Sequence, residues 1–421
     1  MTSYTDTTNA AMEHLETMAE VHPDLSTEYN QISDLFSRKL WHQLTVALLE
    51  FVSPPEVGAD PAKKVTLRAT PDGGNSYLAL FDRVVLACDS KLNPLSLAQI
   101  ASAVASSLAE NASAPTVTDA EKDGLAARAV LENLLEKRSK LGPAASLFVE
   151  SKLVLLGLKM MQQQGKTDKA QYQSFKETLA NGAKVLEELE GESAVVPSAF
   201  YEASSGYRKI VGPPEAFYTE ALMYLNYTPV ESMTEEERYI LATDLSLAAL
   251  TGDKVFNFGE VVATPILGCL NGTPNEWLME MMHCFTKGDV VKFHSITEAS
   301  AAGIQSQPAL VSRAVLVKEK ITLLALVNMI FERPSNERTL GFDEIADRTK
   351  LSKNEVEMAV MRALSLGLIK GSMDQVDETL SVSWVMPRVL DQSQLKGLSE
   401  RFGEWAVKVS KTRDYMGEKT E

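Results

Sequence analysis

Two groups of residues in this chain have the types needed for chemistry, and the first is Gly165-Lys166-Thr167. These residues match the end of a phosphate-binding loop, in which backbone N–H groups and a lysine hold the phosphates of a nucleotide. The full motif needs an earlier glycine at position 160, which is Met160, and Gly157 lies too far upstream. The motif also follows a strand, whereas the preceding residues 153–164 predict a helix. The tripeptide therefore indicates a helix C-terminus and a turn.

The histidines and cysteines form the second group, because both side chains bind zinc. His283 and His294 do not have H-x-H or H-E-x-x-H spacing, and Cys284 would lie on a different side of a helix from His283. The cysteines (Cys88, Cys269 and Cys284) form no C-x-x-C pair, and their odd number argues against a disulfide framework. No G-x-S-x-G or dinucleotide-binding glycine pattern occurs. We therefore expect no catalytic residue, no metal and no cofactor.

Composition indicates two or three domains and substantial apolar cores, since the chain has 421 residues of which 45% are hydrophobic. Its formal net charge is −16. The N-terminus is polar and acidic, unlike a signal peptide or a basic transit peptide. The apolar run Ile321–Phe331 is too short to span a bilayer. These features predict a soluble intracellular protein.

The most distinctive pattern lies at 337–387 and predicts a winged helix, which is a short strand, two helices and a two-stranded wing. Ser352 and Glu355 have the spacing of a capping box at the start of the second helix. Gly367 lies where a helix C-terminus favours positive φ. The predicted elements are a strand at Thr339-Leu340, a helix at Phe342–Thr349, a second helix with an apolar face of Val356, Ala359, Val360, Ala363 and Leu364, and paired strands at Leu368-Ile369 and Leu380–Trp384 around a turn at 374–379.

Winged helices usually bind DNA, but the charges of this one argue against nucleic acid. Residues 337–390 contain seven Lys or Arg and nine Asp or Glu, a net charge of −2. The second helix is neutral, because Lys353 and Arg362 are offset by Glu355 and Glu357. A DNA-binding protein derives much of its affinity from roughly 6–10 cationic phosphate contacts. We therefore expect the module to bind protein.

Upstream of the winged helix, amphipathic segments joined by short loops predict an α-solenoid of helical hairpins. The segment Ser37–Val52 places Trp41, Leu44, Leu48 and Phe51 on one face. Residues 53–75 break the pattern with proline, glycine and scattered charge, which predicts a flexible loop. Further helices are predicted at about 76–88, 95–109, 119–140, 144–163, 168–190, 197–211, 214–226, 234–251, 258–270, 274–286 and 313–331.

Helical repeats that run into a winged helix are the layout of PCI domains, and several segments resemble one family more closely. The chain resembles the family of the non-ATPase regulatory subunit 13 of the 26S proteasome lid. The 53–75 loop is longer than is usual in that family, and the first thirty residues match weakly. The segments that carry the resemblance are KLWHQLTVALLEFV (39–52), KLNPLSLAQI (91–100), GDKVFNFGE (252–260) and the long block 339–391.

The resemblance implies a non-catalytic scaffold subunit of the regulatory-particle lid in the cytoplasm and nucleus, a hetero-oligomer with no specific nucleic acid or membrane partner. PCI subunits of this kind assemble side by side through their winged helices. The alternative is a PCI subunit of the signalosome or of a translation-initiation complex. The predicted organisation is an N-terminal segment (1–36), a helical-repeat arm (37–210), the helical part of the PCI domain (211–312), its winged-helix part (313–390), and a C-terminal helix and tail (391–421).

The segment Gln392–Tyr415 after the wing predicts a helix that is apolar on one side only. Its stripe has the 3-4-3-4 spacing of a coiled-coil seam, and such a helix is marginal in water unless the stripe is buried. Packing on its own PCI domain is one outcome. The outcome we favour, which the resemblance also implies, is a bundle with helices of other lid subunits. The candidate partner-binding residues are Leu395, Leu398, Phe402, Trp405 and Val409.

Val382 and Trp384 are the apolar residues of the last predicted strand. We expect both to pack the wing onto the helix that contains Ile321–Phe331, and the alternative for Trp384 is an interface with a partner.

Overall fold

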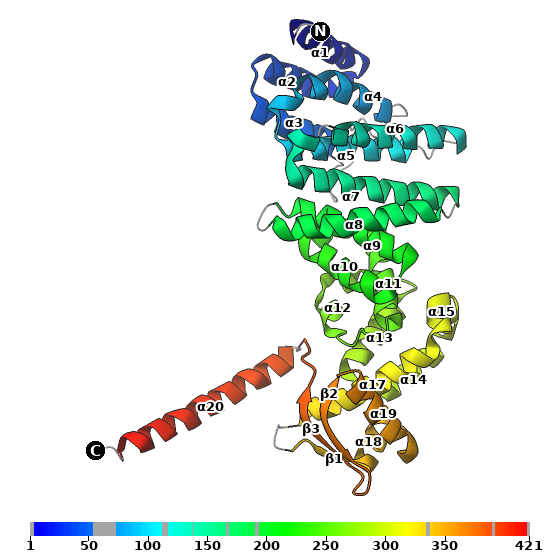
Figure 1. Cartoon of the computed structure of the whole chain (residues 1–421), viewed down its shortest axis with the longest axis vertical. Coiled ribbons are helices and arrows are strands. Elements are labelled where there is room, and N and C mark those ends of the chain that lie inside the picture. Colours follow the sequence, from blue (N-terminus) through cyan, green and yellow to red (C-terminus); the bar gives the residue numbers. More distant parts are fainter. Residues whose placement is uncertain are drawn as a thin grey trace. The chain divides into compact units, whose positions relative to one another are not determined.

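The structure is a computed structural model that describes residues 4–53, 73–111, 117–136, 138–165, 168–189, 193–333, 337–389 and 392–418. The chain divides into two compact units, Met1–Thr234 (unit 1) and Glu235–Glu421 (unit 2). Over the described residues it is mainly helical, with a small three-stranded sheet in unit 2. The predicted fold class, a helical solenoid followed by a winged helix, is confirmed (Figure 1).

Unit 1 is a stack of helices in which each packs on helices next to it in the chain, as Figure 1 shows from α1 to α10. Short 3-10 or π turns link some of them, at Pro23–Leu25, Phe81–Val85, Leu86–Lys91 and Val230–Ser232. The helices are α1 (Tyr4–Val21), α2 (Ser26–Ser37), α3 (Trp41–Val52), α4 (Gly73–Leu80), α5 (Pro94–Asn111), α6 (Val117–Glu136), α7 (Arg138–Gln164), α8 (Lys169–Glu188), α9 (Val195–Val211) and α10 (Pro214–Tyr227).

The predicted helix over Ser37–Val52 was wrong at its start. The chain leaves α2 after Ser37, passes through Lys39 at φ +56°, and re-enters a helix at Trp41. A left-handed residue cannot continue an α-helix, so the sequence pattern joined two elements. The predicted buried face holds for Leu44, Leu48 and Phe51, while Trp41 is only partly buried and packs edge-on against Phe36.

The weakly matched segment 1–36 contains α1 and most of α2, which the sequence did not predict as helices. Both contribute to the core through Ala11, Leu15, Tyr29 and Ile32, each at most 1% exposed. The predicted loop 53–75 lies mostly outside the described residues, except that Gly73–Asn75 already belong to α4.

Helix α7 contains a segment, Leu141–Gln164, that is long and apolar enough to cross a membrane by length and composition alone. Of the most apolar window in α7, 56% is buried within the structure. Its Lys152 forms an ion pair of 2.5 Å with Glu202 of α9. These contacts are those of a core helix in a helical stack.

Unit 2 begins with helices and ends with the winged helix and a long C-terminal helix. The predicted helix at 258–270 is two shorter elements, because Pro265 cannot continue α12. The helices α14, α15 and α16 have no counterpart among the predicted segments. The helices are α11 (Glu235–Thr251), α12 (Gly259–Ala263), a 3-10 turn (Pro265–Leu270), α13 (Glu276–Lys287), α14 (Val290–Ala299), α15 (Ala301–Gln305), α16 (Pro308–Ser312), α17 (Ala314–Glu332), α18 (Phe342–Thr349), α19 (Lys353–Ser365) and α20 (Gln392–Glu418).

The winged helix forms as predicted, with β1 (Thr339–Gly341), β2 (Ile369–Asp374) and β3 (Thr379–Val385) in the antiparallel order β1-β3-β2. The capping box of Ser352 and Glu355 is present, and Gly367 has φ +70°. Val356, Val360 and Ala363 of α19 are fully buried. Ala359 and Leu364 are partly buried beside them.

Trp384 does not pack into the core as expected, and a β-bulge explains why. Lys370 pairs with Trp384 and Gly371 pairs with Val382, so Ser383 is an extra residue in β3. An extra residue reverses the alternation of faces along a strand. Val382 is therefore buried, while Trp384 is 38% exposed on the other face. The Nζ of Lys370 lies 5.0 Å from the centroid of the Trp384 ring, a cation–π contact.

Candidate protein-interaction surfaces

Gly165 directly follows α7, and His283 lies within α13. Gly165 has φ +61° and donates its N–H to the carbonyl of Gln162, as a residue closing a helix does; Lys166 and Thr167 lie outside the described residues. Burial, and then Lys287 and Lys292, lower the pKa of His283 below its usual 6.5. Within the described part of the chain, no group of three or more His, Cys, Asp or Glu is placed to hold a metal ion.

The helix that would read DNA is α19, and ion pairs within the chain engage both of its cations. Lys353 Nζ lies 3.1 Å from Asp343 Oδ1 and also pairs with Glu378. Hydrogen bonds to Glu378 and then Asp343 raise the pKa of Lys353 above 10.5. Arg362 Nε lies 2.7 Å from Glu319 Oε1 on α17. Both cations of α19 therefore already have acidic partners within the chain.

The exposed face of α19 carries two methionines that the sequence analysis did not select. Met358 is 68% exposed and Met361 is 45% exposed. Methionine is flexible and polarisable, and it is common on surfaces that bind proteins. The signal was present in the sequence, because Val356, Val360 and Ala363 already fill the core stripe and leave these two apolar residues outside it.

The three-stranded sheet offers a second surface, since β1 and β2 are its outer strands and β3 is central. The free edge of an outer strand presents backbone N–H and C=O groups that a strand of another chain can pair with. Trp384 lies exposed on the face of the same sheet.

The C-terminal helix α20 carries several exposed apolar side chains of unit 2. Its 27 residues would extend about 40 Å as a straight helix, and Figure 1 draws it as one continuous helix. All five candidate residues are exposed, with Leu395 at 52%, Leu398 at 38%, Phe402 at 62%, Trp405 at 65% and Val409 at 48%. Soluble monomers rarely expose a contiguous apolar surface of this kind, and those that do commonly bind a partner there. The assignment of these residues to a partner stays a prediction.

Comparisons with known proteins cover nearly the whole chain. A family model described as PSD13 N-terminal repeats matches residues 28–282, and a model described as PCI domain matches residues 302–384. The first match extends past residue 210, where we predicted the arm to end.

Two similar proteins carry the same description. The 26S proteasome non-ATPase regulatory subunit 13 homolog B of Arabidopsis thaliana is 34% identical over 404 residues, which cover 96% of each chain. The 26S proteasome non-ATPase regulatory subunit 13 of Dictyostelium discoideum is 32% identical and covers 94% of each chain.

The alternative class is represented by a more distant relative. The eukaryotic translation initiation factor 3 subunit M of Aspergillus oryzae is 26% identical, over only 46% of this chain and 41% of its own. The subunit 13 proteins match over nearly their whole length, whereas the initiation factor subunit matches over less than half, so the similarity favours the proteasome subunit. The solenoid, the winged helix and these matches lead to one conclusion: the chain belongs to the family of the 26S proteasome non-ATPase regulatory subunit 13.

Proposed function

We propose that the chain is a non-catalytic scaffold subunit of the proteasome lid in the cytoplasm and nucleus, and that it contributes to ubiquitin-dependent protein degradation through assembly. The observation that carries this proposal is the apolar stripe of α20, which is exposed along the helix in the isolated chain. Such a stripe needs a partner. Family membership supplies the class of partner, namely the other subunits of the regulatory particle.

The winged helix provides the first proposed contact. The sheet has two outer strands, and Met358 and Met361 of α19 are exposed, while the two cations of α19 are engaged in ion pairs. These features suit side-by-side contacts between the PCI domains of neighbouring subunits.

The second proposed contact is a bundle of α20 with C-terminal helices of neighbouring subunits. Its seam is regular, and burying Leu398 and Phe402 stabilises the assembly by roughly 1.5–3 kcal/mol per side chain. Trp405 contributes somewhat more because of its larger area. The competing arrangement, in which α20 folds back on its own PCI domain, buries the same residues without a partner.

The test is incorporation of a tagged chain into the complex in cells. The double variant Phe402→Asp with Trp405→Asp should lose several kcal/mol of association, and lid subunits should no longer co-purify with it. The free chain should melt at an unchanged temperature by circular dichroism. A matched control is Lys396→Ala with Lys411→Ala. It changes the net charge by the same amount as the aspartate variant, but on the polar side of α20.

Two results would contradict the proposal. If the aspartate variant incorporates as well as the control, α20 makes no essential contact between subunits. If the free variant melts many degrees lower, α20 packs within its own chain. Recovery of signalosome or initiation-complex subunits with the unchanged chain, in place of proteasome subunits, would favour the alternative class.

A further inference from the structure

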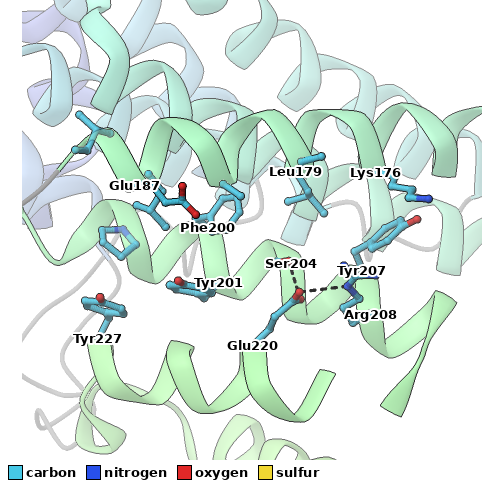
Figure 2. Close-up of a pocket in the computed structure, with 15 residues that line it drawn as sticks. Lys176, Leu179, Glu187, Phe200, Tyr201, Ser204, Tyr207, Arg208, Glu220 and Tyr227 are labelled. Atoms are coloured by element: carbon cyan, nitrogen blue, oxygen red, sulfur yellow. Dashed lines mark hydrogen bonds and ion pairs between the residues drawn. The ribbon is translucent and has the colours of Figure 1, made fainter. Parts of the chain in front are cut away.

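Unit 1 contains a groove that the proposed contacts of the winged helix and α20 do not use. It lies between α8, α9 and α10 and has a cavity volume of about 630 Å³. Figure 2 shows α8 along one side, α10 along the other, and side chains of α9 between them. Gly182, which is buried in α8, lets this helix approach α7 and α9 closely, because an added Cβ would lie 2.8 Å from Leu147 Cδ1 and 3.0 Å from Phe200 Cε2.

The walls of the groove have the periodicity that receives a helix. Leu179, Ala183 and Leu186 line it from α8 at the spacing i, i+4, i+7. Pro197, Phe200, Ser204 and Tyr207 line it from α9 at steps of 3, 4 and 3. Leu179, Phe200 and Tyr207 are at most 8% exposed, so Ala183, Leu186 and Pro197, which are partly exposed, are the apolar groups that a third helix can contact between α8 and α9.

Aromatic and polar groups define the α10 side. Tyr227 stacks on Tyr201 with ring planes 6° apart and remains 40% exposed at the rim. Glu220 accepts hydrogen bonds from Ser204 Oγ at 2.7 Å and Arg208 Nε at 3.2 Å, so these polar groups satisfy one another. Figure 2 shows this network toward the Lys176 end of the groove.

The ends of the groove carry opposite charges. Lys176 lines one end and Glu187 the other, and neither forms an ion pair with a described residue. Glu187 is near enough to Tyr201 to help raise the pKa of that phenol above 10.0, after burial, Tyr227 and Glu220. The two charges are eleven positions apart on α8, which is about 16 Å along a helix axis.

We propose that this groove binds an amphipathic helix of a partner protein. The helix has an apolar stripe at 3-4 spacing, a basic residue against Glu187, and an acidic residue about 16 Å away against Lys176. The walls select a helix over an extended peptide, and the end charges fix which way the helix lies. A groove of this design adds a third partner-binding surface to the chain, independent of the winged helix and of α20.

The probe is a display library of amphipathic helices about 16 residues long, selected on the full chain. Apolar residues are fixed in one stripe and all other positions vary. A second library of extended, proline-containing peptides runs beside it. We expect helices to be enriched, and the enriched helices to carry a base and an acid eleven positions apart.

Two arginine substitutions on α8 separate groove binding from binding elsewhere, including at α20. Ala180 is exposed and lines the groove, whereas its exposed neighbour Asn181 does not. Ala180→Arg fills the groove and should weaken the selected helices about tenfold or more, while Asn181→Arg should leave their affinity unchanged. Glu187→Lys should weaken them roughly 1.5- to 5-fold, as expected for an exposed ion pair.

A further variant, Tyr227→Ala, tests groove binding even if Ala180→Arg destabilises the fold and lowers the melting temperature. It removes the rim without filling the groove, and it should also weaken the selected helices. Equal affinity for the Ala180→Arg and Asn181→Arg variants would overturn the proposal. So would enrichment of proline-containing peptides alone, or failure of any helix to be enriched. None of these outcomes depends on incorporation into the proteasome, so this inference and the proposed function fail separately.

Discussion

Lys320 of α17 donates a hydrogen bond from Nζ to the carbonyl oxygen of Ala249, 2.9 Å away in the last turn of α11. The lysine is only 1% exposed, and its Nζ lies 5.5 Å from the ring centroids of both Phe256 and Phe258. A donor at a helix C-terminus satisfies carbonyls that lack a partner within the helix. This contact links α17, which packs on the winged helix, to α11, the first helix of unit 2.

Replacing Lys320 should therefore destabilise unit 2. Lys320→Ala leaves a cavity and a buried carbonyl without this donor, and we expect a loss of about 3 kcal/mol or more in the free energy of unfolding. Lys320→Met fills most of the volume and should cost about 1–3 kcal/mol. Chemical denaturation measures both variants, with Lys318→Ala on the exposed side of α17 as the control. A loss for Lys320→Ala no larger than the control's would refute the structural role.

Gly288 ends α13 in the left-handed conformation, at φ +64°. An added Cβ would lie 2.8 Å from Ala325 Cα and 2.9 Å from the Leu324 oxygen, both backbone atoms of α17. Gly288→Ala should thus combine backbone strain with a steric clash and cost about 2–4 kcal/mol. Gly272→Ala is the matched control, because φ is +72° there and nothing lies within 4 Å, so strain alone should cost about 1 kcal/mol. Equal melting temperatures for the two variants would contradict this account.

The three cysteines should differ in reactivity. Burial raises the pKa of Cys88 to about 12, so about one in 10⁴ of these thiols is ionised at pH 8. Burial also raises the pKa of Cys284, whereas Cys269 is partly exposed. In the native chain, iodoacetamide should modify Cys269 first and the other two only after denaturation. Peptide mass spectrometry over time measures this, and equal native rates for Cys88 and Cys269 would disprove it.

His14 should make unit 1 less stable in mild acid. Burial, and secondarily Arg83, lower the pKa of His14 below 6.5, and its Nε2 is buried with no hydrogen-bond partner among the described residues. Below about pH 6.5 the unfolded chain binds a proton more readily than the folded chain. The neutral imidazole therefore makes its full contribution to the free energy of unfolding above about pH 6.5. This contribution is lost as the pH falls toward the lowered pKa of His14 in the folded chain.

The slope of this loss is at most about 1.4 kcal/mol per pH unit for one group. His14→Phe removes the titrating group, so its free energy of unfolding should depend less on pH between about 6.5 and 5 than that of the unchanged chain. Urea denaturation at several pH values gives both curves. His42→Phe, at an exposed histidine of α3, controls for loss of a histidine as such. Parallel curves for the unchanged chain and His14→Phe would rule out this contribution.

Nucleic acid should not be a specific ligand of the winged helix. Lys353 and Arg362 are held by acids of the same chain, and the net charge is −16. Fluorescence anisotropy near physiological salt should show no binding tighter than the roughly 10⁻⁴–10⁻⁶ M of non-specific contact. Asp343→Asn with Glu378→Gln frees Lys353 and should not create sequence preference. Submicromolar, sequence-dependent binding by the unchanged chain would reverse this conclusion.

Local sequence predicted those features that short-range physics controls. The capping box of Ser352 and Glu355, the positive φ of Gly367 and the buried stripe of α19 each depend on residues within a few positions of one another. The same holds for the exposed seam of α20, whose spacing alone predicts a helix with one apolar side. These relations survive any tertiary arrangement, so periodicity and capping rules were sufficient to find them.

Tertiary structure decided the features that join distant positions or depend on one extra residue. The bulge at Ser383 turned Trp384 outward, against the alternation in the sequence. Arg362 found its partner in Glu319, and Lys320 became a buried donor to Ala249. The groove of unit 1 is formed by three helices together, and in the sequence of each helix alone its lining residues are indistinguishable from an ordinary amphipathic face. Sequence periodicity says which side of each element is apolar, but only packing determines which apolar surface stays uncovered and which charge is already paired.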